Sequence, residues 1–433
     1  MSKTISNVII LFSGQVGRVF IALINTILLA RLLDPSDRGI FAILTTFPLT
    51  VSLICSFGIP QVNAVYCGLY KEKRSQLILQ SILFGFLISL ITSIGIIWLY
   101  NYAPQSLGKL GELNSTVLYI GASIAVLMTV NILLRELVRG CELIKKLSLS
   151  FITNSLIILI GYLYIYFEQK GIQEALVVIL IAEVFFTLFF LYSLKDNFKI
   201  NTPFEKPFFA QVLKKAGIYF IGGILYTIAS PILLMNYIPV SAADIGKFSI
   251  AFIICLRCEI IPNTIVNVLL PNLCNENTAK EELGPKISQL CRVTLIVYIP
   301  VVILSCIFVQ YALIPLIGTA YSGAEALFYI LIIGSLLSSN GKVLSMYYNV
   351  IDSPKYETLF TTVRSVTQIA LIFILAVQWG VIGIAIGISI SRLFRILVTY
   401  HFFLKDTNTK FLDLFPNINE MKNTLNRIKK ILN

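Results

Sequence analysis

Twelve apolar stretches, each about as long as a membrane-spanning helix, follow one another between residues 6 and 403. A helix needs roughly 20 mostly apolar residues to cross the hydrocarbon core of a bilayer. The breaks between the stretches are polar and leave no room for a sizeable soluble domain. This pattern predicts an all-α polytopic membrane protein with about twelve transmembrane helices.

The predicted spans fall into two sets of six. The first set comprises residues 6–29, 39–65, 77–100, 113–134, 147–167 and 173–192. The second set comprises residues 216–236, 246–270, 287–310, 324–348, 359–378 and 381–403.

Composition excludes a soluble protein. Residues of the AVILMFWYC group make up 57% of the chain and charged residues only 13%, whereas a soluble domain is about a quarter charged. The net charge of +12 would suggest nucleic-acid binding in a soluble protein. In a membrane protein, positive charge of this kind orients the chain toward an anionic leaflet.

The positions of Lys and Arg test this explanation. With an even number of spans and a cytoplasmic N-terminus, the basic residues should concentrate in alternate connections. Most of the 34 do so, within residues 71–74, 135–146, 195–215, 280–292, 342–364 and 405–430. The opposite connections hold only Arg31, Arg38, Lys109, Lys170 and Lys247. We therefore predict that both termini are cytoplasmic and that no nucleic acid is bound.

The long connection after the sixth span divides the chain into lobes. We predict an N-lobe of residues 1–192, a cytoplasmic linker of residues 193–215 and a C-lobe of residues 216–403. A short repeat supports two parallel six-helix lobes, because Asp37-Arg38-Gly39-Ile40-Phe41 opens the second span and Asp244-Ile245-Gly246-Lys247-Phe248 opens the eighth. Parallel repeats of this kind rock against each other around a site near the midplane.

The tail, residues 404–433, differs in kind from the spans. Apolar residues recur at helical spacing from Ile418 to Leu432, with basic residues between them. This pattern favours a basic amphipathic helix on the inner leaflet, although a solvated helix or a disordered end fits the same residues.

A polar stripe follows one face of the first span. Asn7, Gly14, Arg18 and Asn25 fall on that face, with Gln15 beside it. An arginine at the bilayer centre costs about 2.5–3.5 kcal/mol, so it should face a cavity. We assign Arg18, Gln15 and Asn25 to the lining of a water-filled lumen that receives an anion. The alternative is an arginine held by a carboxylate or by free carbonyls of a neighbouring span.

A second arginine lies in the eighth span. Arg257 shares its face with Asn267 and lies near Asn263, while Glu259, two residues away, points elsewhere and cannot neutralise it within the helix. Pro262 should loosen this helix. Guanidinium groups donate in pairs to phosphate, so Arg18 and Arg257, one from each lobe, are placed to grip a diphosphate.

Two acids inside spans, Glu183 and Glu259, are candidates for a proton or sodium relay, and ion pairing explains such residues equally well. Arg135, Glu136 and Arg139 end the fourth span, where we assign them only to orientation. In the twelfth span, Arg395 is placed to reach the inner headgroups.

No chemical machinery is visible. The chain has one histidine, His401, and lacks H-E-x-x-H, P-loop and G-x-S-x-G patterns. Cys255 and Cys258 have the spacing of a metal pair but lie in an apolar span without a second pair, so we predict no metal and no cofactor. Energy must then come from an ion gradient or from the substrate's own gradient.

Several motifs resemble one family. The run Ala30-Arg31-Leu32-Leu33-Asp34-Pro35-Ser36-Asp37-Arg38-Gly39-Ile40-Phe41-Ala42 resembles the segment after the first span of polysaccharide repeat-unit flippases (Wzx-type, O-antigen and capsule), in the multidrug/oligosaccharidyl-lipid/polysaccharide (MOP) superfamily. Asp34 stands where the family usually has glycine, which should alter only a turn. Similar pieces follow in the family's order: Arg139-Gly140, Asp244-Ile245-Gly246, Leu270-Pro271, Gly318-Thr319-Ala320-Tyr321 and Asp352-Ser353-Pro354-Lys355.

The resemblance implies a MATE-like fold in the bacterial inner membrane. It further implies that an undecaprenyl-diphosphate-linked oligosaccharide crosses from the cytoplasmic to the outer leaflet by alternating access. We expect a monomer that contacts membrane lipids and works beside polysaccharide assembly proteins, and not an enzyme.

Three rivals remain. An ion-coupled multidrug or cation exporter of the same superfamily should carry acids rather than arginines in its lumen. A membrane-embedded polysaccharide polymerase or ligase needs a large outer loop, and the outer connections here are short. A structural protein needs no charges at midplane.

Overall fold

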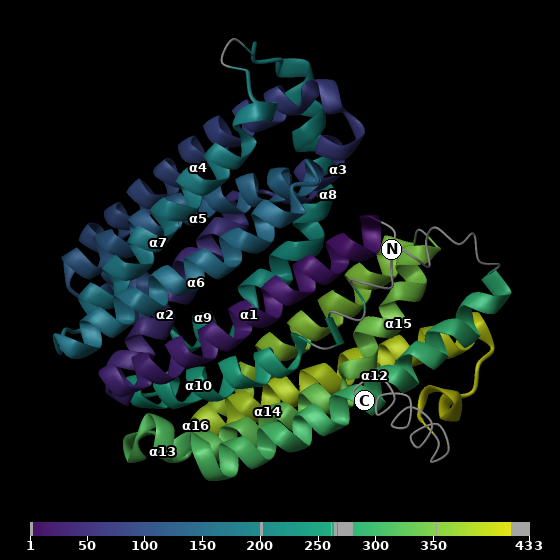
Figure 1. The fold of residues 1–433 in the computed structure, drawn as a ribbon. Coiled ribbons are helices and arrows are strands. Elements are labelled where there is room, and N and C mark those ends of the chain that lie inside the picture. Colours follow the sequence, from purple (N-terminus) through teal and green to yellow (C-terminus); the bar gives the residue numbers. More distant parts are fainter. Residues whose placement is uncertain are drawn as a thin grey trace. The chain divides into compact units, whose positions relative to one another are not determined.

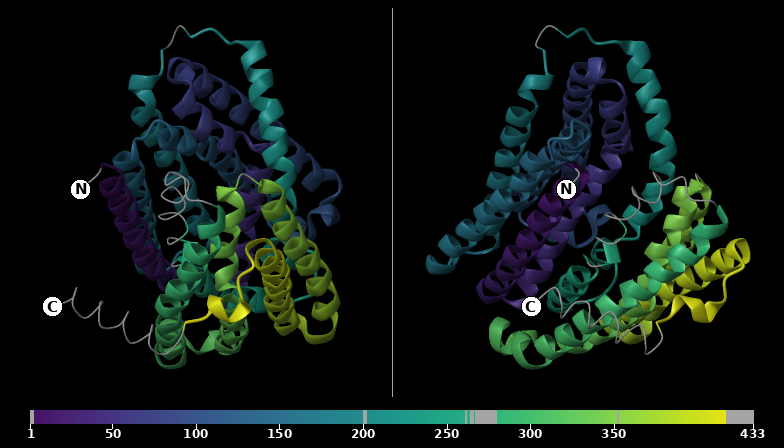
Figure 2. Two further views of the ribbon diagram at one scale, coloured as in Figure 1. Left: turned by 90° about the vertical axis from the view of Figure 1, so that its right-hand side faces the viewer. Right: turned by 45° about the vertical axis from the view of Figure 1, so that its right-hand side comes forward.

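Helices form all the regular structure in the part of the chain that the computed structural model describes, residues 3–199, 202–260, 262–263, 266, 280–351 and 353–416 (Figures 1 and 2). They group into two compact units, Met1–Ser249 and Ile250–Asn433. The predicted all-α fold is confirmed.

The first unit is a bundle in which α5 contacts α2, α3, α4 and α7, while α6 contacts α1 and α7. Its main helices are α1 (Lys3–Leu32), α2 (Pro35–Cys55), α3 (Ile59–Leu69), α4 (Arg74–Tyr102), α5 (Ser115–Gly140), α6 (Ile144–Phe167), α7 (Ile172–Leu194), α8 (Lys206–Ile228) and α9 (Pro231–Met235). Short helical turns η1 (Lys71–Lys73), η2 (Pro104–Glu112) and η3 (Lys195–Asn197) join some of them.

Helix α10 (Ala242–Cys258) begins in the first unit and ends in the second. In the second unit α15 contacts α12 and α16, and α14 contacts α16. Its elements are α12 (Lys280–Phe308), the π-helical turn η4 (Val309–Leu313), α13 (Ile314–Ile317), η5 (Thr319–Tyr321), α14 (Ala324–Leu337), α15 (Ser339–Val350), α16 (Pro354–Thr407) and η6 (Phe411–Leu414).

Each of the twelve predicted spans overlaps a helix of the structure. By length and apolar composition, eight helical segments of the described chain can cross a membrane, which fits a multi-pass protein. One of them, Lys355–Thr407, has 53 residues, enough for two passes of about 20 residues each.

The long helix α16 reverses at Gly380, whose backbone has φ 54° and ψ −134°. Glycine is favoured at a positive φ because glycine has no Cβ to clash with the backbone. The two arms then pack closely, since a Cβ on Gly383 would lie 2.1 Å from the Leu375 carbonyl oxygen. The predicted break between the last two spans is therefore confirmed.

Helix α10 ends at Cys258, four residues before Pro262. The chain leaves the helix at Cys258 and makes a turn at Glu259. Pro262 has no N–H to donate to the Cys258 carbonyl, which is the bond a continuous helix would need. The Glu259 N–H still donates to the Cys255 carbonyl at 3.3 Å, and the Asn263 N–H donates to the Glu259 carbonyl at 3.3 Å. That Pro262 loosens this helix stays a prediction.

Connections predicted to share one face of the membrane come together in the first unit. Ser75, just after η1, donates from its hydroxyl to the Lys199 carbonyl at 3.4 Å, and Lys146 at the start of α6 donates to the Ser193 carbonyl at 3.2 Å. These residues lie in three of the basic connections. Their grouping agrees with the predicted alternation, and which face is cytoplasmic stays a prediction.

The opposite connections meet as well. In η2, Lys109 Nζ donates to the carbonyls of Met235 and Ile238 at 2.8 and 2.6 Å. Asn236 Nδ2 in turn donates to the Leu107 carbonyl at 2.7 Å. Segments after α4 and after α8 are thus held together at one end of the unit.

The second unit repeats the grouping with apolar contacts. Leu283 and Ile287 of α12, Val343 of α15, Phe403 of α16 and Leu414 of η6 belong to one buried cluster. Three basic connections predicted to share a face therefore lie together in this unit also.

The repeat seen in the sequence has a structural role. Gly39 of α2 and Gly246 of α10 face each other: a Cβ on Gly39 would lie 1.8 Å from the Ala242 carbonyl oxygen, and one on Gly246 would lie 2.0 Å from the Pro35 carbonyl oxygen. The matching glycines let the first turns of two helices touch backbone to backbone.

Asp34, which replaces the family's usual glycine, caps α2. Its carboxylate accepts a hydrogen bond from the Asp37 backbone N–H at 2.8 Å, satisfying a donor that a helix N-terminus leaves open. That Asp34 alters only a turn stays a prediction.

The units divide at a different place from the predicted lobes. Helices α8 and α9 pack on α2, and α8 also packs on α3, so the first unit extends to Ser249. The predicted division at residues 193–215 stays a prediction. The predicted tail helix lies, from residue 417 onward, outside the described residues.

Candidate functional site

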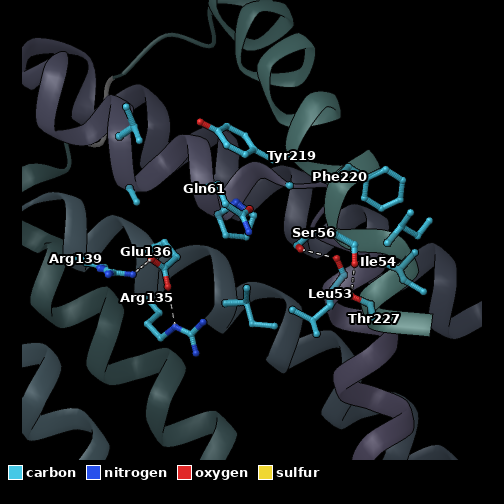
Figure 3. A pocket seen from close by; sticks show the side chains of 17 residues that line it. Leu53, Ile54, Ser56, Gln61, Arg135, Glu136, Arg139, Tyr219, Phe220 and Thr227 are labelled. Carbon is cyan, nitrogen blue, oxygen red and sulfur yellow. Dashed lines mark hydrogen bonds and ion pairs between the residues drawn. The ribbon is translucent and has the colours of Figure 1, made fainter. Parts of the chain in front are cut away.

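A cavity of about 580 Å³ opens in the first unit. Its walls come from the break between α2 and α3, from the last turns of α5 and from α8, as Figure 3 shows. Its charged and polar lining consists of Ser56, Gln61, Arg135, Glu136, Arg139, Tyr219 and Thr227.

The break between α2 and α3 shapes one wall. Gly58 has φ 73°, and a Cβ there would lie 2.3 Å from the Ala216 carbonyl oxygen of α8. Beside it, the rings of Phe57 and Phe220 lie 4.6 Å apart. The glycine lets α8 approach the break, and the two rings pack against each other beside it.

The charged wall is the end of α5. Glu136 lies 3.2 Å from Arg135 Nε and 3.4 Å from Arg139 Nη1. The carboxylate is 14% exposed, whereas the two arginine side chains are 39% and 58% exposed. One half-buried carboxylate thus pairs with two more exposed guanidinium groups, so the charged wall carries two positive charges and one negative charge.

These three residues were assigned above only to orientation, and the structure adds that they line the cavity. Arg135 and Arg139 are four residues apart, so they lie on one face of α5. That spacing was visible in the sequence, whereas the opposing walls from α3 and α8 were not.

Arg18 lies elsewhere in the same unit. Its side chain is exposed, and its guanidinium carbon lies 5.0 Å from the Phe151 ring centre, on α6. Its charge also acts on Glu183. Arg18 does not line the cavity described above.

Asn25 is buried, and its Nδ2 donates to the Ser155 carbonyl at 3.2 Å. This bond ties α1 to α6. Gln15 lies in α1, but its side chain is outside the described part of the structure.

Glu183 of α7 is tied to α5 by hydrogen bonds. Asn131 Nδ2 donates to its carboxylate at 2.7 Å and to its backbone carbonyl at 3.0 Å, while Thr187 donates to Asn131 Oδ1 at 2.9 Å. The carboxylate therefore has polar partners within the first unit, and its predicted role as a relay stays a prediction.

The second unit contains a dense cationic cluster around Glu259. The Glu259 carboxylate lies 2.6 Å from Arg392 Nη2 and 3.5 Å from Lys342 Nζ, and it accepts a hydrogen bond from Ser335 at 3.1 Å. Lys342 also donates to Asn263 Oδ1 at 2.6 Å. As the spacing predicts, Glu259 turns to other helices and not to Arg257.

Two more arginines complete the cluster. A small void of about 20 Å³ is lined by Glu259, Lys342, Arg364, Arg392 and Arg395. Arg395 pairs at 3.0 Å with Glu357 and so does not depend on lipid headgroups for a partner. Lys342 and Arg364, counted above as charges of a connection, lie inside α15 and α16.

Arg257 is half-buried on α10. Within the described residues, its Nε has no hydrogen-bond partner. Asn263 contacts Lys342 and not Arg257 in the bonds described above, and Asn267 lies outside the described residues. Across those residues, no group of three His, Cys, Asp or Glu side chains could hold a metal ion.

The all-helical, multi-pass fold of the described residues is the fold that MurJ and MATE transporters share. Residues 4–275 match the family model described as "Polysaccharide biosynthesis protein". The chain belongs to this family. No curated protein matches the chain by sequence.

Solved structures share the fold. The lipid II flippase MurJ in an inward closed conformation superposes with a TM-score of 0.76 at 17% identity, over 95% of this chain and 89% of that one. An inward-facing multidrug MATE transporter gives 0.66 at 15% identity, over 93% and 98%. A Vibrio cholerae MATE transporter mutant gives 0.57 at 15% identity, over 95% and 100%.

Proposed function

We propose that this protein moves undecaprenyl-diphosphate-linked oligosaccharide repeat units from the cytoplasmic to the outer leaflet of a bacterial inner membrane. The product would supply O-antigen, capsule or another surface polysaccharide. Family membership supports a role in polysaccharide biosynthesis, and the fold is shared with a lipid II flippase.

The observation that carries the proposal is the cavity with Arg135 and Arg139 in its wall. Guanidinium forks suit the paired oxygens of a diphosphate. Glu136 holds both forks while leaving them accessible. An anionic headgroup can then be bound without burying an unpaired cation when the cavity is empty.

The remaining lining suits sugars. Tyr219 offers a ring and Gln61 an amide, and the volume of about 580 Å³ lies within the usual range for small-ligand sites, about 300–1,000 Å³. Such a mixture of aromatic faces and neutral hydrogen-bonding groups fits one or a few sugar rings beside the diphosphate.

Arg18 and Arg257 keep their proposed role as further cations on the substrate's path. Their substitution by alanine should reduce export while the protein still inserts. Coupling to protons or sodium through Glu183 or Glu259 is part of the same proposal.

The decisive experiment uses purified protein in proteoliposomes that contain an undecaprenyl-diphosphate-linked oligosaccharide. Translocation is followed by enzymatic labelling of sugars that reach the outer leaflet, with and without a pH or sodium gradient. Arg135→Ala and Arg139→Ala should each slow translocation at least tenfold.

Lys145→Ala is the matched control. Lys145 is an exposed cation in the next helix, α6, and does not line the cavity, so this variant should stay within twofold of the wild type. Equal loss in all three variants, or normal rates in both arginine variants, would reject the cavity as the substrate site.

A rival is a multidrug exporter, since MATE transporters share the fold. The same vesicles distinguish the two: an exporter would accumulate organic cations and leave the lipid-linked oligosaccharide in its original leaflet.

A further inference from the structure

Two thiols from different helices meet in the first unit. Cys67 lies in the last turn of α3, and Cys141 follows directly after α5. Both are free and buried, and their sulfur atoms lie 3.0 Å apart. A disulfide bond joins its sulfur atoms at about 2.05 Å, so the pair is about 1 Å from bonding distance.

The backbones of the two helices approach closely at this point. A Cβ on Gly140 would lie 2.7 Å from the Cβ of Cys67, so the neighbour of Cys141 has no room for a side chain. The Cys67 sulfur also lies 3.7 Å from the Leu137 carbonyl oxygen. One turn earlier, Asn63 Nδ2 donates to the Leu133 carbonyl at 3.5 Å. The packing of α3 on α5 therefore holds the two thiols together.

The pair lies at the ends of two helices that line the cavity. Ala64, three residues before Cys67, and Arg139, two residues before Cys141, both belong to the lining. Cys141 is itself 7% exposed. A small oxidant that enters the cavity therefore comes within one helical turn of each thiol.

The two thiols differ in reactivity. The hydrogen bond from the Cys67 thiol lowers the pKa of the Cys141 thiol, and the charge of Arg74 acts in the same direction. Arg74 is held beside the pair, because its Nε donates to the Cys67 carbonyl at 2.8 Å. The thiolate is the form of cysteine that attacks an oxidant. Cys141 is thus the attacking sulfur, and Cys67 is placed to react second.

The position of the pair favours a reversible bond. Cys141 lies within the basic connection of residues 135–146, and Cys67 lies four residues before the connection of residues 71–74. Both connections are predicted to be cytoplasmic. Cytoplasmic thiols are kept reduced, and disulfides that form there are usually transient and redox-sensing. A disulfide at this place is therefore suited to regulation and not to permanent stabilisation.

We propose that Cys67 and Cys141 form a redox clasp, a pair of thiols that hydrogen peroxide converts into a disulfide bond between α3 and α5. The Cys141 thiolate attacks one peroxide oxygen and becomes a sulfenic acid, while the O–O bond breaks and the leaving hydroxide takes up the proton that the thiol lost. The Cys67 sulfur then attacks the Cys141 sulfur, and its proton leaves with the sulfenic hydroxyl as a second water. The pair loses two electrons and two protons, and one peroxide becomes two waters.

The disulfide fixes one part of the cavity wall to another. Helix α3 has only 11 residues and follows the break at Gly58, whose φ is 73°, so packing is what holds α3 against α5. The bond makes this attachment covalent until a thiol reductant breaks it. The effect on transport rests on the proposed function, because alternating access requires the cavity walls to move. Formation of the disulfide does not depend on transport.

Disulfide mapping on the full-length protein in nanodiscs tests the redox clasp. The protein is treated with hydrogen peroxide, denatured, blocked with N-ethylmaleimide and digested for mass spectrometry. Peptides joined through Cys67 and Cys141 should appear, and dithiothreitol should separate them. Recovery of both cysteines as N-ethylmaleimide adducts, or of Cys141 as a sulfinic acid without joined peptides, would overturn the proposal. The measurement uses the wild type, so it does not depend on whether a variant folds.

Thermal unfolding gives a second readout. The disulfide would join residues 74 apart in sequence and so should stabilise the folded state. Hydrogen peroxide should raise the melting temperature of the wild type by several degrees, and it should leave that of Cys67→Ala unchanged. Cys306→Ala is the matched control, because Cys306 is a free cysteine of the second unit, and it should respond as the wild type does. A rise that persists in Cys67→Ala, or disappears in Cys306→Ala, would reject the redox clasp.

A third arm measures transport in proteoliposomes that contain an undecaprenyl-diphosphate-linked oligosaccharide. Oxidised wild type should translocate it at least fivefold more slowly than reduced wild type, and dithiothreitol should restore the rate. Oxidised Cys67→Ala should stay within twofold of its reduced form. A disulfide-bonded wild type with an unchanged rate would reject the regulatory role. If the reduced wild type translocates nothing, the transport proposal fails, and the mapped disulfide and the thermal shift still decide whether the redox clasp exists.

Discussion

Gly39 of α2 and Gly246 of α10 pack so closely that neither position has room for a Cβ. The contact is reciprocal. Gly39 faces the carbonyl oxygen of Ala242, four residues before Gly246, and Gly246 faces the carbonyl oxygen of Pro35, four residues before Gly39. The backbone must move if either glycine acquires a side chain.

We expect Gly39→Ala and Gly246→Ala each to destabilise the protein by about 1–3 kcal/mol, the usual cost of overpacking. Thermal unfolding of the purified protein measures this. Gly95→Ala is the control, because a Cβ there meets nothing within 4 Å and alanine is the better helix former. Equal melting temperatures for Gly39→Ala and Gly95→Ala would show that the close crossing is absent.

Arg392 and Glu259 form a buried pair in the second unit, with side chains 3% and 13% exposed. Arg392→Met removes the nearest cation from a buried carboxylate, which typically costs about 3–5 kcal/mol. Because the double variant Arg392→Met/Glu259→Gln leaves no orphaned carboxylate, it should recover part of the loss. The free energy of unfolding is measured for the wild type, Arg392→Met, Glu259→Gln and the double variant, and gives the coupling energy between the two side chains. If the effects of the two single substitutions simply add, the direct pair is contradicted.

Lys109 fastens η2 to the segment after α9 through two carbonyls, those of Met235 and Ile238. Burial lowers the pKa of Lys109. Lys109→Met should therefore speed hydrogen exchange of residues 104–112 several-fold without unfolding the helices. Lys170→Met, at another exposed connection, should leave this exchange unchanged. If Lys109→Met and Lys170→Met gave the same exchange rates for residues 104–112, the Lys109 hydrogen bonds would not be what holds η2 in place.

Glu205 ties the segment before α8 to α4. Hydrogen bonds from Gln76 and from Lys73, the latter at 3.2 Å, lower the pKa of the Glu205 carboxyl. Since the folded protein holds this proton more weakly than the unfolded chain, the contact contributes fully above the unfolded pKa of about 4.3 and is lost as the pH falls through the lower folded value.

Hydrogen exchange of residues 202–209, corrected for intrinsic rates, should therefore rise as the pH falls through the acid range. Glu205→Gln should flatten this response, whereas Glu168→Gln, at an exposed position, should not. If exchange still rises with falling pH in Glu205→Gln, another titratable group must cause the rise.

The sequence was sufficient to predict where the helices lie, because each apolar stretch has about the length that a helix needs to cross the bilayer. Even the division of α16 at Gly380 followed from a short polar break. The loop charges also predicted which connections lie together, as the bonds from Ser75 and Lys146 show.

The sequence predicted less of the cavity and of the cluster around Glu259, for a physical reason. The cavity wall at Arg135 depends on α3 and α8. The cluster around Glu259 depends on Lys342, Arg364 and Arg392, which come from helices far apart in sequence. Periodicity places a residue on one face of its own helix and does not identify the helix opposite. The sequence marks Arg18 and Arg257 because each is an isolated charge in an apolar span. Arg135 and Arg139 lie beside Glu136 at a helix end, a position that by itself indicates only the orientation of the helix.

The reversal at Gly380 bears on how the chain is made. Without it, the 54 residues of α16 would form a straight rod of about 80 Å at 1.5 Å per residue, far longer than a bilayer is thick. The last two crossings must therefore leave the translocon as one hairpin, and a residue that resists this backbone geometry at position 380 should show its defect during biogenesis, before any substrate is met.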